Sequence, residues 1–327
     1  MGGMPAEWAL HERTLMAWPC RKELWGSTIE EARRDHATVI NAIAAFEPVT
    51  LVVHPSDAAD ATAAVTDRVE VVQRPIDDSW MRDTGPIYVV DESGLRTGVH
   101  FRFNGWGGSF TPFDGDEEAG RWLVEHLGDP IGEVPLVLEG GSIAVDGHGV
   151  LLTTEECLLH PNRNPDHSRQ EIEALLIEHL GVERVVWLGQ GLVEDRDTDG
   201  HVDLIASFCA PGRVLLQTVP EGNPNFERCE ENRRRAEDAG LEIVPVEQLS
   251  YVEVAGEEVA VSYLNHYVCN RAVIVPVAGT EHDEPALATI AGGFPGREIV
   301  PVPGAVLAYG GGGPHCVTQQ VPEEARD

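Results

Sequence analysis

The sequence LVLEGGSIAVDGHGV, residues 136–150, gives the clearest indication of how this chain folds. An apolar run over 136–145 meets a second run, 150–153, across the turn Asp146-Gly147-His148-Gly149. Short apolar runs bounded by turn residues predict strands, and this spacing predicts a hairpin. The run at 87–90 ends in a similar turn, Asp91-Glu92-Ser93-Gly94. Because hairpin strands are antiparallel, the pattern favours a mixed sheet or a propeller over a doubly wound parallel sheet.

Strands and helices alternate along the rest of the chain. Runs rich in Val, Ile and Leu predict strands at 49–53, 185–188, 214–219, 243–246, 272–277 and 299–302. Helical patterns occur at about 28–46, 57–66, 115–127, 167–180, 227–239 and 284–292. In the helix at 167–180, Ser168 and Glu171 have the spacing of a capping box, and Gly181 is a stop signal. Since no linker interrupts the alternation, we expect one α/β domain over residues 1–327.

Charge and composition exclude several classes of protein. The chain has 23 Lys and Arg against 55 Asp and Glu, so its net charge of −32 repels nucleic acid and attracts a small cation. Of the 23 Lys and Arg residues only one is lysine, so adaptation to salt or a GC-rich genome is favoured over substrate steering as the cause of the acidity. No apolar run approaches the ~18 residues of a membrane span. Six scattered cysteines and a signal-free N-terminus predict a cytoplasmic protein.

Two segments combine carboxylates with turn residues. The first, DDSWMRDTGP at 77–86, places Trp80 among acidic residues and resembles the lip of a site, although a solvated loop is equally consistent. The second, LEGGS at 138–142, places Glu139 before two glycines that allow a close backbone approach. An ordinary hairpin turn is the better interpretation of the second segment taken alone.

The acidic segment DRDTDGHVD at 195–203 offers polar groups at alternate positions. If it leads into a strand, Asp199, His201 and Asp203 share one face and project into a cavity. A calcium loop is the alternative, but its twelfth position is Ala206 where a glutamate is required. We therefore expect no metal site in this segment.

The glycine-rich segment YGGGGPHCVTQQ at 309–320 contains the best candidate nucleophile. Four glycines let the backbone approach a ligand, and the segment lacks the lysine of a phosphate loop. Cys316 is the cysteine with a glycine-rich, polar context, whereas Cys157, Cys209 and Cys269 lie in apolar, strand-like runs that predict inert thiols.

Together these segments are similar to the agmatine deiminase and bacterial peptidylarginine deiminase family of guanidine-modifying enzymes. The similarity covers nearly the whole chain and runs through residues 4–8, 18–19, 77–86, 103–108, 138–146, 161–165, 197–203, 262–265 and 310–320. It implies a five-bladed, pseudo-symmetric α/β propeller with the site in its central cavity.

The same resemblance implies the roles of five catalytic residues. Cys316 would be the nucleophile and His201 the acid and base, with Glu139 as the partner of the histidine. Asp83 and Asp203 would grip the guanidinium. Carboxylates match the planar N–H fork of this cation, which stays protonated at ordinary pH. The cationic substrate and His201 would lower the pKa of Cys316.

Substrate binding is expected to involve three further residues. The resemblance places Trp80, Trp106 and Asn265 around the substrate, and it implies neither a metal ion nor an organic cofactor. The chain departs from the family in a shorter loop after Gly108 and in Gly313-Pro314, Leu204 and His266. These differences bear on which guanidine is bound, because the catalytic set is intact.

The sequence thus predicts hydrolytic deimination of a small guanidine, with agmatine as the leading substrate. Deimination of arginine, peptidyl-arginine or a modified arginine is the first alternative, followed by amidinotransfer and by non-catalytic guanidine binding. An arginine substrate needs a cation for its carboxylate, and Arg102 is the candidate. Pairing of Arg102 with surface acids is the favoured role. A homodimer is possible, and no nucleic-acid or membrane partner is expected.

Overall fold

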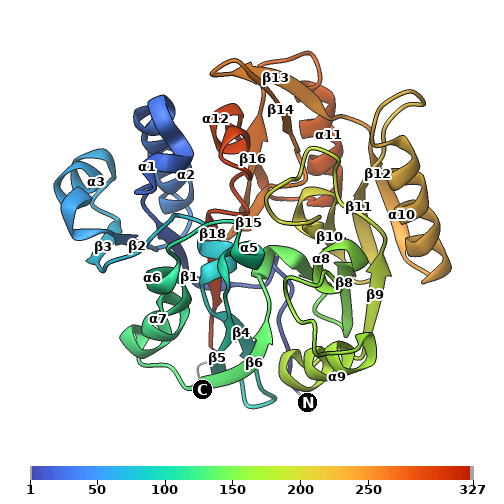
Figure 1. Ribbon diagram of the computed structural model, residues 1–327, viewed down its shortest axis with the longest axis horizontal. Coiled ribbons are helices and arrows are strands. Elements are labelled where there is room, and N and C mark those ends of the chain that lie inside the picture. Colours follow the sequence, from blue (N-terminus) through green and yellow to red (C-terminus); the bar gives the residue numbers. More distant parts are fainter. Residues whose placement is uncertain (1, 325–327) are drawn as a thin grey trace.

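The strands of the computed structural model, which describes residues 2–324, form small sheets arranged around the molecule (Figure 1). Among these residues, four three-stranded sheets share one pattern, in which the first strand is antiparallel to the second and the second is parallel to the third. These sheets are β4 (Ile87–Val90), β5 (Arg96–Arg102) and β6 (Ile131–Val137); β7 (Ile143–Val145), β8 (Val150–Thr154) and β9 (Arg184–Leu188); β10 (Ala206–Ala210), β11 (Arg213–Gln217) and β12 (Glu242–Val246); and β15 (Tyr267–Cys269), β16 (Ala272–Val277) and β17 (Glu298–Pro303).

A fifth sheet joins segments from opposite ends of the described chain. Strand β18 (Thr318–Pro322) pairs antiparallel with β1 (His11–Ala17), which is followed by the parallel strands β2 (Val49–Val53) and β3 (Val69–Gln73). Because β18 pairs with β1, the segment just before β18, which contains Cys316, lies at the end of this same sheet. A separate hairpin consists of β13 (Ser250–Val254) and β14 (Glu257–Val261).

Helices make the crossovers that parallel strands require. The crossover helices are α2 (Ile29–Ala44), α3 (Ala58–Ala64), α7 (Ala119–Leu127), α9 (Arg169–Leu180), α10 (Phe226–Asp238) and α11 (Asp283–Gly293). Helices α3, α7, α9 and α10 lie on the outside of the molecule in Figure 1. Short helical turns complete the chain: α1 (Lys22–Trp25), η1 (Gly26–Thr28), η2 (Pro55–Asp57), α4 (Met81–Thr84), α5 (Gly105–Gly108), α6 (Asp114–Glu117), η3 (Gly140–Ser142), α8 (Glu155–Leu158), η4 (Val202–Leu204) and α12 (Ala305–Tyr309).

The predicted α/β class and the two predicted hairpin turns are confirmed, but the run 136–145 is not one strand. Strand β6 ends at Val137, the turn η3 follows, and β7 begins at Ile143. A Cβ added to Gly140 would lie 2.2 Å from the carbonyl oxygen of Arg82. This close backbone contact breaks the strand and leaves Glu139 fully buried.

No helix in residues 2–324 combines the length and the hydropathy of a membrane span. The apolar side chains instead pack between each sheet and its helix. Leu151 of β8, for example, lies in one buried cluster with Ile172 and Leu176 of α9. Such packing fixes the strands and therefore the loops at their ends.

The predicted capping box of α9 is confirmed and gives a test of the fold. Ser168 Oγ accepts from the backbone N–H of Glu171 at 3.3 Å, and Glu171 Oε2 accepts from the backbone N–H of Ser168 at 2.7 Å. We expect Ser168→Ala to lower the free energy of unfolding by about 1 kcal/mol, the usual cost of losing an N-cap. Urea unfolding would measure this change, and Ser168→Thr should retain most of the stability. Because α9 lies on the outside of the molecule, Ser168→Ala should leave the catalytic activity of the folded protein unchanged. A loss of that activity would contradict the prediction.

Candidate active site

Asp83, Asp203 and His201 converge around a glycine. A Cβ added to Gly141 would lie 2.6 Å from His201 Nδ1, 2.9 Å from Asp83 Oδ1 and 3.0 Å from Asp203 Oδ2. The four residues come from α4, η3 and the segment around η4, and all are buried. The missing side chain at position 141 therefore lets two carboxylates and an imidazole approach one another.

Asp83 is held by donors from two sides. Its Oδ1 accepts from the backbone N–H of Gly141 at 2.9 Å, and its Oδ2 accepts from Trp106 Nε1 at 2.9 Å. Trp106 has a left-handed φ of 52°, which is uncommon for a bulky residue, and such conformations gather at functional sites. Burial raises the pKa of Asp83, and the charge of His201 opposes the rise.

Asp203 belongs to a buried chain of charges behind the candidate nucleophile. Its Oδ2 lies 2.8 Å from His315 Nδ1, and His315 Nε2 lies 2.6 Å from Glu7 Oε1. Burial alone would raise the pKa of Asp203, but His315 outweighs it and the pKa is lowered. Burial would also raise the pKa of Glu7, which His315 and Arg82 instead lower to about 2. Asp203 is therefore a carboxylate whose Oδ1 has no hydrogen bond within the described residues.

The Cys316 thiol contacts two of the predicted residues. Its Sγ donates to Asp203 Oδ2 at 3.3 Å and accepts from Asn265 Nδ2 at 3.1 Å, while Asn265 Oδ1 accepts from the backbone N–H of Cys316 at 3.2 Å. Asn265 thus holds the thiol directly, although substrate contact was the predicted role. Burial raises the pKa of Cys316 well above its usual value, and Asp203 and Asp83 add to the rise. His201 therefore does not by itself lower this pKa in the substrate-free site.

His201 and Glu139 retain free polar atoms although both are buried. Within residues 2–324, the two ring nitrogens of His201 make no hydrogen bond, and Oε2 of Glu139 makes none either. Arg163 Nε donates to Glu139 Oε1 at 2.6 Å. Burial would lower the pKa of His201, but the neighbouring carboxylates, Asp83 foremost, raise it overall. These free atoms can bind a polar ligand and exchange protons with it.

A cavity connects this cluster with the two predicted tryptophans. It is lined by Trp80, Asp83, Trp106, Phe110, Asp197, Thr198, Gly310, Gly311 and Cys316. A larger cavity of about 260 Å³ shares Asp197 and Gly311 with it. The wall of the larger cavity also includes the acidic residues Glu194, Asp195, Glu257 and Glu258. The smaller cavity thus reaches Cys316, and the larger one beyond it has an acidic wall.

The predicted shared face of Asp199, His201 and Asp203 is wrong. Asp195 Oδ2 accepts from the backbone N–H groups of Gly200 and His201, both at 3.0 Å, so the segment is a loop that leads into η4 and not into a strand. Asp199 instead accepts from Arg163 Nη1 at 2.7 Å. Of these three residues, His201 and Asp203 lie in the cluster around Gly141, and Asp199 does not.

Arg102 does not enter the cavity. Its Nε lies 2.6 Å from Glu117 Oε1, and the side chain is 60% exposed, as expected for a surface ion pair. Arg196 is the arginine that lines the larger cavity. The sequence placed Arg196 beside Asp195 and Asp197, but nothing in that pattern showed which side chain faces inward.

The prediction for Cys157 needs correction as well. Cys209 and Cys269 lie in strands, as predicted, but Cys157 lies in the short helix α8. Its sulfur, a carboxylate oxygen of Glu139 and an imidazole nitrogen of His201 all lie within 4.8 Å of one another. Cys157 is buried, as expected, but it adjoins the site.

Comparison with known proteins gives a consistent result along the whole chain. Residues 3–322 match the model of the Porphyromonas-type peptidyl-arginine deiminase family. The agmatine deiminase of Stutzerimonas stutzeri is 41% identical, over 98% of this chain and 95% of that protein. The solved agmatine deiminase of Enterococcus faecalis has a TM-score of 0.94 and 32% identity, covering 99% of this chain and 96% of that one. A cysteine-to-serine variant of the C. jejuni agmatine deiminase, solved with substrate bound, has a TM-score of 0.92 and 25% identity. The match covers 100% of this chain and 98% of that one.

The raised pKa of Cys316 predicts how the substrate-free thiol reacts. Below its pKa a thiol gains about tenfold in thiolate for each pH unit, and the thiolate is the reactive form. Iodoacetamide should therefore alkylate Cys316 about tenfold faster per unit from pH 6 to pH 9, measured by mass spectrometry of its peptide. Cys316→Ser identifies that peptide. A rate that levels off below pH 8 would show a preformed thiolate and contradict the prediction.

Proposed function

The chain belongs to the Porphyromonas-type peptidyl-arginine deiminase family, and from this premise we propose that it hydrolyses agmatine to N-carbamoylputrescine and ammonia. It is a hydrolase that acts on the C–N bonds of linear amidines. The observation that carries the proposal is the convergence of the Cys316 thiol with Asp203, Asp83 and His201 in one buried cluster. The proteins named agmatine deiminase support the choice of substrate.

Binding places the guanidinium among the carboxylates. The free Oδ1 of Asp203 and the oxygens of Asp83 accept its N–H groups, and Trp80 and Trp106 border its planar faces. The added positive charge opposes the effect of the carboxylates on Cys316 and lowers the pKa of its thiol. The thiol proton is then released to solvent, and the thiolate lies beside the central carbon of the substrate.

The first half of the reaction forms a covalent intermediate. The Cys316 thiolate attacks the guanidinium carbon, and a C–S bond forms as one C=N bond becomes single. Protonated His201 donates its proton to the leaving nitrogen, and ammonia departs with the C–N bonding pair. The product is a thiouronium cation on Cys316. The raised pKa of His201 suits the donation, because it favours the protonated imidazole before the attack.

The second half returns the enzyme to its starting state. Neutral His201 removes a proton from water, and the hydroxide adds to the thiouronium carbon. The C–S bond then breaks with its electron pair on sulfur, the hydroxyl proton of the adduct passes to the thiolate, and the neutral ureido product leaves. Glu139, fixed by Arg163, lies beside the imidazole and stabilises its charged form. The solved C. jejuni variant, in which serine replaces a cysteine and substrate is retained, supports this use of the cysteine.

Acidic residues beyond the reaction centre favour a substrate with a cationic tail. Asp197 lines both cavities, and Glu194, Glu257 and Glu258 lie farther along the larger one. The terminal amine of agmatine is positive at neutral pH and would be attracted there. Arginine carries a carboxylate in the corresponding region, and the acidic wall would repel it.

Arg196 supports arginine as the second candidate substrate. It lines the larger cavity together with Asp197, and a guanidinium can bind a substrate carboxylate in bidentate fashion. In that case the two residues would together hold a zwitterionic tail.

We further propose that residues 1–327 form one catalytic domain, with the five sheets as the blades of a pseudo-symmetric propeller around the site. The shared strand pattern of the sheets and the β1–β18 pairing support this arrangement. The catalytic residues come from segments that follow several of these sheets. Free cysteines such as Cys157 and Cys316 are typical of a reducing compartment, and the cytoplasm is the proposed location.

The substrate preference tests the proposed function. Steady-state assays of ureido product should give agmatine a kcat/KM at least tenfold above arginine and a C-terminal arginyl peptide, about 1.4 kcal/mol of discrimination. Cys316→Ser should retain less than about 1% of the activity, since a hydroxyl ionises far less readily than a thiol. A higher kcat/KM for a carboxylate-bearing substrate would refute agmatine and leave the deiminase chemistry standing.

The role of Asp197 is tested by comparing agmatine with a guanidine that lacks its terminal amine. Asp197→Asn should raise KM for agmatine about tenfold and change kcat much less, because tail binding contributes equally to ground state and transition state. Butylguanidine, which lacks the terminal amine, should show almost no change. Arg196→Gln is the matched control for agmatine and should instead weaken any turnover of arginine. An equal loss with both guanidines would assign Asp197 a structural role.

A further inference from the structure

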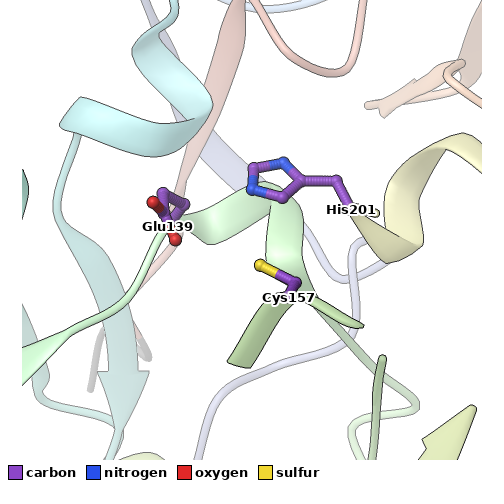
Figure 2. A group of neighbouring side chains, drawn as sticks. All are labelled: Glu139, Cys157 and His201. Atoms are coloured by element: carbon purple, nitrogen blue, oxygen red, sulfur yellow. The ribbon is translucent and has the colours of Figure 1, made fainter. Parts of the chain in front are cut away.

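The proposed reaction does not use the thiol of Cys157. This residue lies in α8, where its backbone N–H donates to Thr154 Oγ1 at 3.2 Å, and it is fully buried. One side of it packs in the apolar cluster that contains Leu138 and Leu176. The sulfur, however, points toward the catalytic side chains (Figure 2).

Three different ligand atoms meet at this point. An imidazole nitrogen of His201, a carboxylate oxygen of Glu139 and the sulfur of Cys157 lie within 4.8 Å of one another. In Figure 2 the nitrogen-bearing edge of the imidazole turns toward Glu139, and the sulfur is directed to the same space. Both ring nitrogens of His201 and Oε2 of Glu139 have no hydrogen bond within residues 2–324. Buried polar atoms of this kind are usually paired, so they are open to a ligand.

We propose that Glu139, Cys157 and His201 form an inhibitory site for Zn²⁺. Nitrogen, sulfur and oxygen are the ligand atoms that zinc prefers, and three protein ligands leave the fourth tetrahedral position open to water. Bond lengths of about 2.0–2.3 Å place the ligands of such a site roughly 3.3–3.8 Å apart. Because the three ligand atoms lie within 4.8 Å of one another, side-chain movements of up to about 1.5 Å in each separation bring them to these distances.

The charges of the site are compatible with a divalent cation. A Cys157 thiolate and a Glu139 carboxylate neutralise Zn²⁺, with His201 neutral. The guanidinium of Arg163 opposes the cation, but Arg163 is also bound to Asp199 at 2.7 Å and to the carbonyl oxygen of Thr198 at 3.1 Å. Burial raises the pKa of the Cys157 thiol well above its usual value, so this thiol is protonated before the metal binds. Its proton is therefore released to solvent when the Zn–S bond forms.

Bound zinc would remove the residue that moves protons. His201 coordinated to the metal can neither protonate the leaving amine nor activate water, whereas Cys316 stays outside the three ligands. The loss of turnover rests on the proposed function, but metal binding does not. The two statements are therefore tested with different measurements.

Metal binding is tested in Cys316→Ser, which removes the other thiol near His201. Titration with Co²⁺, a spectroscopic substitute for Zn²⁺, should give one equivalent of binding and a thiolate-to-cobalt charge-transfer band. The band should disappear in the double variant that adds Cys157→Ser and persist in the control that adds Cys209→Ser, a buried cysteine of β10. Thermal melts of these variants, and a further variant with Cys157→Ala, show whether the loss of the cobalt band is due to unfolding. A band that persists without Cys157 in a folded protein overturns the proposal.

Inhibition is tested in the otherwise unchanged enzyme with buffered Zn²⁺. Zinc should inhibit agmatine turnover, and EDTA should reverse the inhibition. Cys157→Ser should raise the zinc concentration needed for half inhibition at least tenfold. Without zinc, the kcat/KM of this variant should differ from that of the unchanged enzyme by less than about threefold. Equal sensitivity in Cys157→Ser would place zinc on Cys316 and overturn the site. If agmatine is not turned over, the proposed function fails, and the cobalt spectra still decide whether the metal site exists.

Discussion

The structure depends on the burial of three carboxylates, Asp83, Asp203 and Glu139, in one small volume. Such groups are costly in a protein interior unless opposite charges or donors compensate them. Arg163 pairs with Glu139, His315 pairs with Asp203, and backbone and indole N–H groups hold Asp83. Oδ1 of Asp203 and Oε2 of Glu139 have no hydrogen bond within residues 2–324. In the proposed function, the need to compensate this buried charge links the stability of the site to a preference for a guanidinium.

The thiol is subject to the same constraint. Asp203 accepts a hydrogen bond from the Cys316 thiol, and burial together with the charge of Asp203 raises the pKa of that thiol, which favours its neutral form in the substrate-free site. His315 lies on the other side of Asp203 and lowers the pKa of that carboxyl, while Glu7 and Asp203 raise the pKa of His315 against the effect of burial. In the proposed reaction, a reactive thiolate therefore forms only when the guanidinium substrate binds. The same buried aspartate would then keep the free thiol protonated and hold the cation that activates it.

The sequence predicted most of the fold because its strands and helices have clear local patterns. The runs 49–53, 87–90 and 272–277 match β2, β4 and β16 at both ends. The break in 136–145 was not predictable from apolar pattern, since it arises from contact between Gly140 and Arg82, 58 positions apart. The motifs named residues that the structure brings together, but they placed Asp199 and Cys157 wrongly and gave no position for the side chain of Arg196. Their directions depend on loop turns and packing that no local period encodes.

Two glycines explain why the site residues can come from separate segments and still meet. A Cβ at Gly141 would lie within 3.0 Å of His201, Asp83 and Asp203, and a Cβ at Gly312 would lie 2.8 Å from Cys316 Sγ. Neither position has a positive φ, so glycine is required there for space and not for backbone conformation. The separations in the reacting cluster are therefore set by backbone atoms. Backbone held by the sheets keeps these separations fixed before the substrate binds, which is the preorganisation that catalysis in a buried site requires.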